Sequence, residues 1–358
     1  MTEVTIRELR VPPSVDDPSI ADLAATTALR NADARLIHGS QAYDVSLAQM
    51  LAGWQDQTDE IGIGRVAEID GTVVASGAVS APQAEGARSA YLNVRVREDL
   101  RGQGIGSTML AELESIAHAQ GRTILQNWSE HAPVPGPSVR AATGWGEVPL
   151  DATTRFAVRH GYRLEQVYRN SALGLEPEPA DLARLGADAE RAAGADYRHE
   201  FWEGPTPDAE VDRLAYLKSR MATDAPSGDL EVEDAPWDAD RIRRYEAVDA
   251  VGGVRRFMGV IRHVPTGELV ALNELSVDPA DLTLAHQNDT LVIREHRGHR
   301  LGMWAKCATL ASLRRLAPEV MRIETYNAEE NRPMLDINEA MGFVPVLYAS
   351  EWQKIVTL

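Results

Sequence analysis

The sequence repeats one pattern of motifs, and this repeat limits the folds that the chain can adopt. An arginine followed by closely spaced glycines occurs at 101–106 and again at 297–302. In each half a later helix-like segment ends at a glycine, Gly161 or Gly342. These two glycines are slightly closer together in the chain than the two arginine-glycine motifs are. We place the difference in the Pro- and Gly-rich stretch 131–149, which we expect to be a long loop. The simplest interpretation is two consecutive copies of one α/β unit.

The periodicity of apolar residues predicts the same order of elements in both halves. Asp70-Gly71 and Thr266-Gly267 are typical of hairpin turns. The first half is expected to contain a strand, two helices, three strands, a helix, a strand, a helix and a strand over 4–12, 21–36, 46–54, 61–69, 72–80, 89–97, 101–121, 123–128, 151–162 and 162–175. In the second half the corresponding segments are 197–204, 208–221, 238–248, 255–263, 268–277, 290–295, 300–316, 321–327, 331–343 and 343–352.

This order predicts two α/β domains, each with a mixed, mostly antiparallel sheet flanked by helices. We expect the first domain over 1–175, a linker over 176–194 and the second domain over 195–358.

The glycine-rich motif of the first half lies between a predicted strand and an amphipathic helix. Glycines let the backbone turn tightly there with its N–H groups pointing inward, and the helix adds the positive end of its dipole. Together these features favour a seat for a diphosphate. The spacing matches neither the phosphate loop that ends in Lys-Ser/Thr nor the dinucleotide-binding glycine motif. A strand-to-helix turn without any ligand is the alternative.

The succession of strand, R-x-x-G-x-G, helix, strand and a helix ending in Gly-aromatic resembles the GNAT superfamily of acyl-CoA-dependent N-acyltransferases. The second half repeats it as TLVIREHRGHRLG and NAEENRPMLDINEAMGF. The resemblance covers nearly the whole chain and is to the two-domain GNAT proteins of actinobacteria. It implies transfer of an acetyl group from acetyl-CoA to a primary amine of a small molecule or peptide, by direct attack in a ternary complex.

The resemblance also implies which residues contact acetyl-CoA. The pantetheine arm is expected on the backbone of one strand in each half, and the diphosphate on the glycine-rich loop and the first turn of the next helix. In the first half these residues are Val94, Arg95, Val96, Arg101, Gly102, Gln103, Gly104, Ile105, Gly106 and Ser107. In the second half they are Thr290, Leu291, Val292, Arg297, Gly298, His299, Arg300, Leu301, Gly302 and Asn331.

Both halves depart from the family's pattern. Arg300 replaces the middle glycine of the second loop, where it could pair with phosphate or close the pocket. The family's last helix opens with Asn and carries a Tyr that protonates the leaving thiolate. Asn331 satisfies the first condition, but Asn338 stands at the Tyr position, and the first half has Ala157 there. A silent, CoA-binding regulatory module is therefore the main alternative to an enzyme, and a decarboxylating or acyl-loading role is a third.

The candidate bases favour the second domain as the site of chemistry, with the opposite assignment left open. Glu274 lies in an otherwise apolar segment, where burial would raise its pKa toward a useful range. Asp289 precedes the next strand, and His286 is a further candidate. A solvent-facing position is the structural alternative for Glu274. The single cysteine, Cys307, is expected to be a buried, inert thiol.

The composition limits the partners. The sequence has 36 basic and 54 acidic residues, which gives a net charge of −18. Such a surface disfavours nucleic acid and anionic lipid, and it weakly favours a cationic amine. The spacing of metal-ligand residue types predicts no metal site. The acidic N-terminal residues are unlike a signal peptide, and no apolar run reaches the length of a membrane span, so we expect a cytoplasmic protein.

Overall fold

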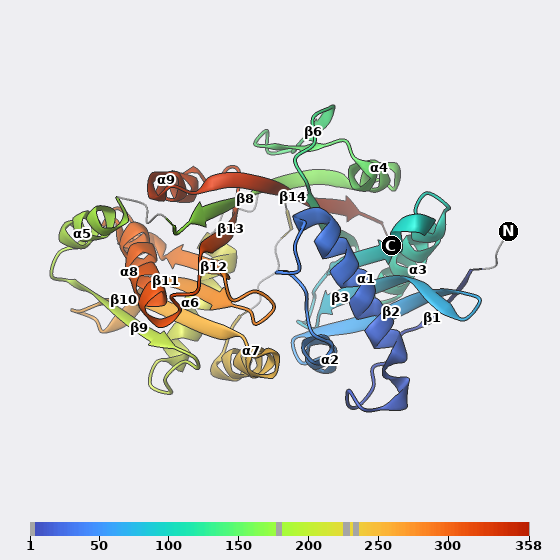
Figure 1. Ribbon diagram of the computed structural model, residues 1–358, viewed down its shortest axis with the longest axis horizontal. Helices are drawn as coiled ribbons and strands as arrows, with labels where there is room; N and C mark the ends of the chain where they lie inside the picture. Colours follow the sequence, from blue (N-terminus) through green and yellow to red (C-terminus); the bar gives the residue numbers. More distant parts are fainter. Residues whose placement is uncertain (1–3, 177–180, 225–229, 232–235, 358) are drawn as a thin grey trace. The chain divides into compact units, whose positions relative to one another are not determined.

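The structure is a computed structural model that describes residues 4–176, 181–224, 230–231 and 236–357. The chain forms two compact units (Figure 1). The first unit contains residues 4–166, 230–231 and 349–357, and the second contains 167–176, 181–224 and 236–348. The contiguous domain limits expected from the sequence stay a prediction. The packing units differ from them because the end of the chain belongs to the first unit.

The first unit is built on a sheet with the order β1-β2-β3-β4-β5-β14. Its elements are β1 Thr5–Glu8, α1 Ala21–His38, α2 Leu47–Gln55, β2 Glu60–Ile69, β3 Thr72–Pro82, β4 Ser89–Val96, α3 Ile105–Ala119, β5 Ile124–His131, β6 Ser138–Arg140, β7 Glu147–Pro149 and α4 Ala152–Arg159. The strand β8 Arg163–Gly174 begins in this unit, and β14 Val344–Ile355 ends in it.

The antiparallel part of this sheet follows from local sequence. Asp70 and Gly71 both have positive φ, 50° and 76°, as a type I′ hairpin turn requires between β2 and β3. A capping box at Ser46 and Gln49 begins α2. The apolar face of α3 packs on the sheet, where Gly77 of β3 leaves room for Met109 and Leu113.

Alternation along β4 assigns its side chains to two helix layers. A Cβ on Gly106 of α3 would meet Val96 and Phe156, so Val96 faces the layer formed by α3 and α4. Arg95 faces the opposite layer, because its Nε lies 3.9 Å from the carboxylate of Asp33 in α1. Odd-numbered residues of β4 therefore face α1 and even-numbered residues face α3 and α4.

The strands β4 and β5 separate midway along their length. They run parallel and pair only over Ser89–Tyr91 and Ile124–Gln126. Beyond this point the side chain of Asn127 donates to the carbonyl of Leu92 at 2.7 Å and spans the gap. The separation leaves backbone groups on the edge of β4 facing a space between the strands instead of a neighbouring strand.

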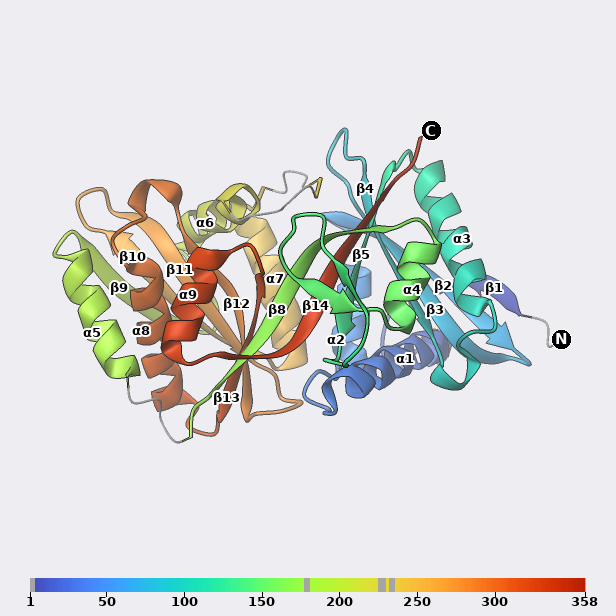
Figure 2. The same cartoon turned by 90° about the horizontal axis from the view of Figure 1, so that it is seen from above.

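The second unit has the sheet order β9-β10-β11-β12-β13-β8. Its remaining elements are α5 Leu182–Ala193, β9 Tyr197–Glu203, α6 Val211–Asp224, α7 Ala239–Gly252, β10 Arg255–His263, β11 Glu268–Val277, β12 Leu284–Val292, α8 Leu301–Leu316, β13 Arg322–Ala328 and α9 Arg332–Met341. Figure 2 shows α8 lying along β10 and β11. The strands β12 and β13 pair in parallel only over 284–287 and 322–325, so they separate as β4 and β5 do.

Two expectations about secondary structure need correction, while the linker expected over 176–194 stays a prediction although it includes a helix. The Pro- and Gly-rich stretch 131–149 is not all loop, because β6 and β7 form a small antiparallel sheet within it. The expected linker contains the helix α5, which packs on α8 of the second unit. The strand β12 begins at Leu284 rather than at Thr290, so Asp289 lies inside the strand.

Candidate active site

The two glycine-rich loops have the same backbone conformation. Gly102 and Gly104 have φ of 77° and 91°, and Gly298 and Arg300 have φ of 90° and 57°. Arg300 therefore keeps the left-handed conformation of the glycine that it replaces. That conformation costs about 1–2 kcal/mol for a residue with a Cβ atom. The second loop holds its shape against this strain.

The helices that follow the loops begin at equivalent residues. The first hydrogen bond of α3 runs from Thr108 N to Gly104 O, and that of α8 from Trp304 N to Arg300 O, both at 3.1 Å. The N–H groups of 105–107 and 301–303 precede these bonds and have no acceptor within the helix. Each helix therefore presents donors and the positive end of its dipole, the arrangement that suits a diphosphate.

The arginines that open the motifs hold the loops in place. Arg101 Nε donates to Val96 O at 3.0 Å, and Arg297 Nε donates to Val292 O at 3.1 Å. Arg101 also pairs with Asp33 of α1. Each guanidinium thus bonds the end of the preceding strand and fixes the loop, and the expected contact of Arg101 and Arg297 with the cofactor stays a prediction.

A pocket of about 280 Å³ lies where β4 and β5 separate in the first unit. Residues of α1 line it on one side of the sheet and residues of α3 and α4 on the other, so the pocket passes between β4 and β5. Its lining residues are Arg30, Asp33, Ala34, Ile37, Leu92, Asn93, Val94, Arg95, Leu110, Asn127, Trp128, Ser129, Glu130, Thr153, Phe156, Ala157 and Tyr162. Val94 and Arg95 are among the residues expected to contact pantetheine. Ala157, at the family's Tyr position, contributes no acid to the pocket.

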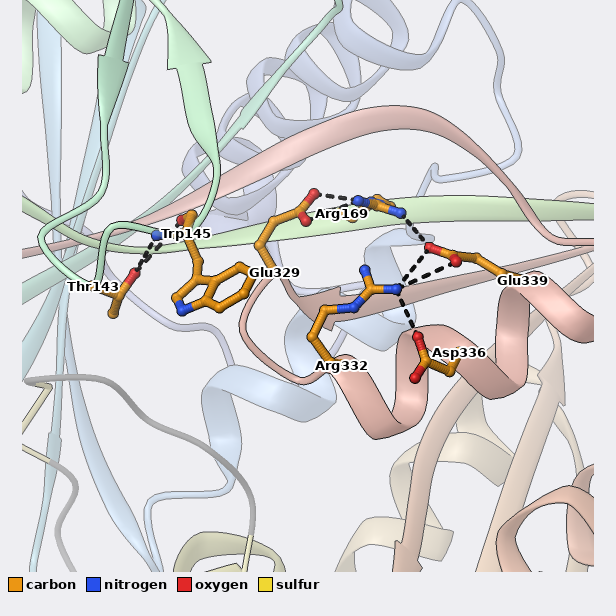
Figure 3. A network of polar contacts seen from close by, with 7 residues as sticks. All are labelled: Thr143, Trp145, Arg169, Glu329, Arg332, Asp336 and Glu339. Atoms are coloured by element: carbon orange, nitrogen blue, oxygen red, sulfur yellow. Dashed lines mark hydrogen bonds and ion pairs between the residues drawn. The ribbon is translucent and has the colours of Figure 1, made fainter.

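Sequence reasoning missed an acid that both halves carry at an equivalent position, within β5 in the first unit and directly after β13 in the second. In the pocket, Glu130 of β5 pairs with His38 of α1 at 3.2 Å. The parallel strand pairs of the two units align Ile124 with Ile323, and this alignment makes Glu329 the equivalent of Glu130. Glu329 accepts two hydrogen bonds of 2.8 Å from Arg169 of β8 (Figure 3). The repeat itself held this signal, since Ile124 to Glu130 and Ile323 to Glu329 have equal spacing.

The structure contradicts the expected raised pKa of Glu274. Its side chain is fully buried, and burial alone would raise its pKa, but the charges of Lys218 and Arg256 outweigh burial and lower the pKa below its usual range. Lys218 Nζ lies 2.5 Å from Glu274, and Arg256 forms a further ion pair with it. A carboxylate held between two cations is a weak base. Glu274 therefore acts here as a buried counter-ion.

Asp289 belongs to the same ion cluster, because its carboxylate lies 2.5 Å from Lys218 Nζ. Lys218 also lies 5.6 Å from the ring of Trp237 and 5.7 Å from that of Tyr245. The two catalytic candidates of the sequence are thus brought together, but around a cation of the chain itself. This internal ammonium satisfies the charge that would otherwise attract an acceptor amine.

The other candidates of the second unit lie in several different elements. Asn331 precedes α9, but its side chain makes no capping hydrogen bond. Asn338 donates to Asn327 at 2.6 Å, so one of its two N–H donors is already used. His286 lies on the paired part of β12, opposite Ser276. Cys307 is buried in α8, and burial raises its pKa to about 11, as an inert thiol requires.

The remaining predicted cofactor residues lie in a strand, a loop and the first turn of a helix in each unit, and their contacts with the cofactor stay a prediction. Val94, Arg95 and Val96 are in β4, and Gly102, Gln103 and Gly104 form the first loop. Ile105, Gly106 and Ser107 are the first turn of α3. Thr290, Leu291 and Val292 are in β12; Gly298, His299 and Arg300 form the second loop; Leu301 and Gly302 begin α8. Ser107 Oγ lies 3.0 Å from His160 Nε2.

A Ser-His-Asp arrangement occurs in the first unit and is structural. His131 Nδ1 lies 2.8 Å from Asp151, and its Nε2 lies 2.7 Å from Ser350 Oγ. Ser350 is fully buried, donates to the carbonyl of Ser129 and accepts from the indole of Trp352. A hydroxyl enclosed in this way cannot reach a substrate. The arrangement fastens β14 to β5 and to the N-terminus of α4.

In the described part of the chain, no group of three or more His, Cys, Asp or Glu side chains is arranged to hold a metal ion. None of the described helices combines the length and the apolar character that a membrane crossing needs.

These features define the class of the fold. Residues 26–132 match the Acetyltransferase (GNAT) family, a stretch that includes α1, the separated strands and the first glycine-rich loop. The chain therefore has the two-domain GNAT fold. No curated protein sequence matches the chain.

Among solved structures, the chain is similar to a tandem GNAT protein from the clavulanic acid biosynthesis pathway. The two share 24% sequence identity with a TM-score of 0.75, covering 99% of both chains. A GCN5-related N-acetyltransferase from Sphaerobacter thermophilus matches at 13% identity and a TM-score of 0.59, over 98% of this chain and 95% of that one. A putative acetyltransferase from Pyrococcus horikoshii matches at 11% identity and a TM-score of 0.55, over 99% and 90%. At these identities the likeness establishes the fold alone.

Proposed function

We propose that the chain is an acyl-CoA-dependent N-acyltransferase, and that it transfers acetyl from acetyl-CoA to a primary amine of a small molecule or peptide. The observation that carries this proposal is the pocket between β4 and β5, which opens to both helix layers of the first unit. A thioester can lie on the α3 side with its diphosphate on the donors of 102–107 while an amine approaches from the α1 side. Such simultaneous occupancy is what direct transfer requires.

We assign the reaction to the first unit rather than to the second, which the sequence had favoured. The pocket of the first unit carries Asp33 and Glu130, two carboxylates on the side where the amine would enter. In the second unit, Glu274 and Asp289 both pair with Lys218, and Glu274 pairs with Arg256 as well. Asp33 and Glu130 are themselves paired, with Arg101 and His38, so the assignment rests on the pocket and not on a free counter-charge. The net charge of −18 weakly favours a cationic acceptor. The acceptor class that fits best is a small cationic amine or a lysine-like group.

The leaving group needs little help in this site. Ala157 supplies no acid, but the thiol of CoA is similar to that of cysteine, whose pKa is about 8.5. A thiolate can therefore depart near neutral pH without a proton from the protein. Backbone N–H groups on the separated edge of β4 are suited to stabilise the oxyanion that forms when the amine attacks.

A CoA-binding module without turnover is the second candidate, and the ion cluster around Lys218 favours it for the second unit. The two candidates predict different outcomes when the protein is mixed with acetyl-CoA and spermidine, kanamycin or a lysine-containing peptide. Release of free CoA thiol that depends on the amine supports the enzyme. Calorimetric binding of acetyl-CoA without thiol release from any of these amines supports the module.

Replacing Gly104 by valine is expected to abolish acetyl-CoA binding in the first unit. Gly104 has a φ of 91°, and its added side chain would extend into open space at the mouth of α3, where the diphosphate is expected. Titration calorimetry should show the loss of one site. Gly121→Val is the matched control, since Gly121 also has positive φ, 76°, and open surroundings, but lies at the other end of the helix. Unchanged stoichiometry in Gly104→Val would contradict the diphosphate seat.

A further inference from the structure

The last strand of the chain contributes side chains to the first unit on both of its faces. Lys354 contacts Glu114 of α3 at 2.8 Å, so the even-numbered residues face the α3 layer. Glu351 and Gln353 point to the opposite face, where Gln353 bonds Gln126 of β5 at 3.1 Å. Glu351 therefore lies on the α1 side of the sheet, the side from which an acceptor would enter.

Glu351 contacts the first unit at the point where β4 and β5 separate. Its carboxylate accepts a hydrogen bond from the hydroxyl of Tyr91. Tyr91 is the last residue of β4 that pairs with β5, and the next residues, Leu92 and Asn93, line the pocket. Tyr91 shares the face of Asn93, because side chains alternate along the strand. Neither Tyr91 nor Glu351 lines the pocket itself, so the pair lies next in the chain and on the same face as the lining residue Asn93 rather than within the pocket.

The two members of this pair differ in their access to solvent. Tyr91 is 43% exposed, whereas Glu351 is 3% exposed. Burial raises the pKa of Glu351 to about 7, and the hydrogen bond from Tyr91 offsets this only in part. The facing residue on β5, Gln126, is neutral, and Arg88 and Glu231 near the same strand ends pair with each other at 3.4 Å. A carboxyl with such a pKa can accept and return a proton near neutral pH.

We propose that Tyr91 and Glu351 form a proton relay that serves the transfer reaction of the first unit. The lone pair of the acceptor amine attacks the thioester carbonyl carbon, and the C–S bond breaks to give an amide and the CoA thiolate. The proton lost by the amine nitrogen passes to the Tyr91 oxygen as Tyr91 gives its own proton to Glu351. Glu351 then releases that proton to solvent through Tyr91. This inference rests on the proposed function and adds its base.

The relay is tested by the pH dependence of kcat/KM, measured as CoA thiol release with the best amine among spermidine, kanamycin and a lysine-containing peptide. Glu351→Gln is expected to lower kcat/KM by about 100-fold and to remove the loss of activity below pH 7. Tyr91→Phe is expected to lower it by about tenfold, since the relay loses its exposed end. Both variants should keep the wild-type affinity for acetyl-CoA. Glu165→Gln is the matched control, because Glu165 is a similarly buried carboxyl of β8, 4% exposed.

Three results would decide against the relay or its premise. If Glu351→Gln and Tyr91→Phe keep the wild-type rate and pH profile, the pair only fastens β14 to β4 and the inference is wrong. A carboxyl titration of Glu351 near its ordinary pKa, measured by infrared difference spectroscopy, would also overturn it and needs no acceptor. If the wild-type protein releases no thiol with any of these amines, the proposed function itself fails, and the relay fails with it.

Discussion

Replacing Trp352 by alanine is expected to lower the free energy of unfolding of the first unit by about 3–5 kcal/mol. Trp352 lies in β14, is completely buried and is the largest of the fully buried side chains. Its indole N–H donates to Ser350 Oγ at 2.7 Å. The substitution removes the burial of a large aromatic surface, leaves a cavity and takes away a buried hydrogen-bond donor.

The effect should reach the candidate site. Ser350 contacts His131 at the end of β5, and His131 contacts Asp151. Asp151 caps α4 by accepting from Thr154 N at 2.8 Å. The strand β5 and the helix α4 both line the pocket. A loosened β14 is therefore expected to weaken acetyl-CoA binding in the first unit as well.

Urea denaturation followed by hydrogen exchange of individual peptides measures this effect, because peptides from each unit report the stability of that unit alone. Ile355→Ala is the control on the same strand, since Ile355 is 67% exposed and its truncation should cost less than about 0.5 kcal/mol. If Trp352→Ala destabilises peptides of the second unit alone, the assignment of the chain end to the first unit is wrong.

Local sequence predicted the parts of this structure that depend on local conformation. The Asp70-Gly71 turn and the glycines of the first loop require positive φ, and both are visible in the residue types. Arg300 shows the limit of that reasoning, because a residue with a Cβ atom holds the same conformation. There the surrounding loop and helix determine the backbone, not the preference of the residue.

Long-range pairing could not be predicted from the sequence. The periodicity of β14 indicates a strand but not its neighbours, so the contacts of Glu351 and Ser350 with residues far away in the chain gave no local signal. The same holds for Glu274. Its apolar surroundings in sequence suggested a raised pKa, whereas the cations that reverse the shift come from α6 and β10. The charge state of a buried acid depends on partners that only the fold brings together.

The two units also differ in charge at one equivalent position of α3 and α8. Lys306 of α8 follows the second loop as Leu110 of α3 follows the first, and Leu110 lines the pocket of the first unit. Lys306 is 1% exposed, and its Nζ has no hydrogen-bond partner among the described residues. It lies 5.3 Å from the ring of Phe343. Burial lowers its pKa from 10.5 to about 7.

Replacing Lys306 by leucine is therefore expected to stabilise the second unit, and by an amount that depends on pH. The unfolded chain binds a proton at Lys306 below its ordinary pKa of 10.5, whereas the folded chain does so only below about 7. Stability of the wild type thus rises with pH across this window, by up to about 1.4 kcal/mol per pH unit. Relative to it, the gain from Lys306→Leu should be roughly 5 kcal/mol at most below pH 7 and should shrink toward pH 10.

Thermal unfolding at pH 6 and at pH 9.5 measures this difference, with Lys354→Leu as the control. Lys354 is paired with Glu114 at 2.8 Å, so its loss should destabilise the protein at both pH values. If Lys306→Leu instead destabilises the protein equally at both, the ammonium has a partner or water in the folded state. A gain confined to the lower pH would mean that the amine is held in the folded core without its proton above about pH 7.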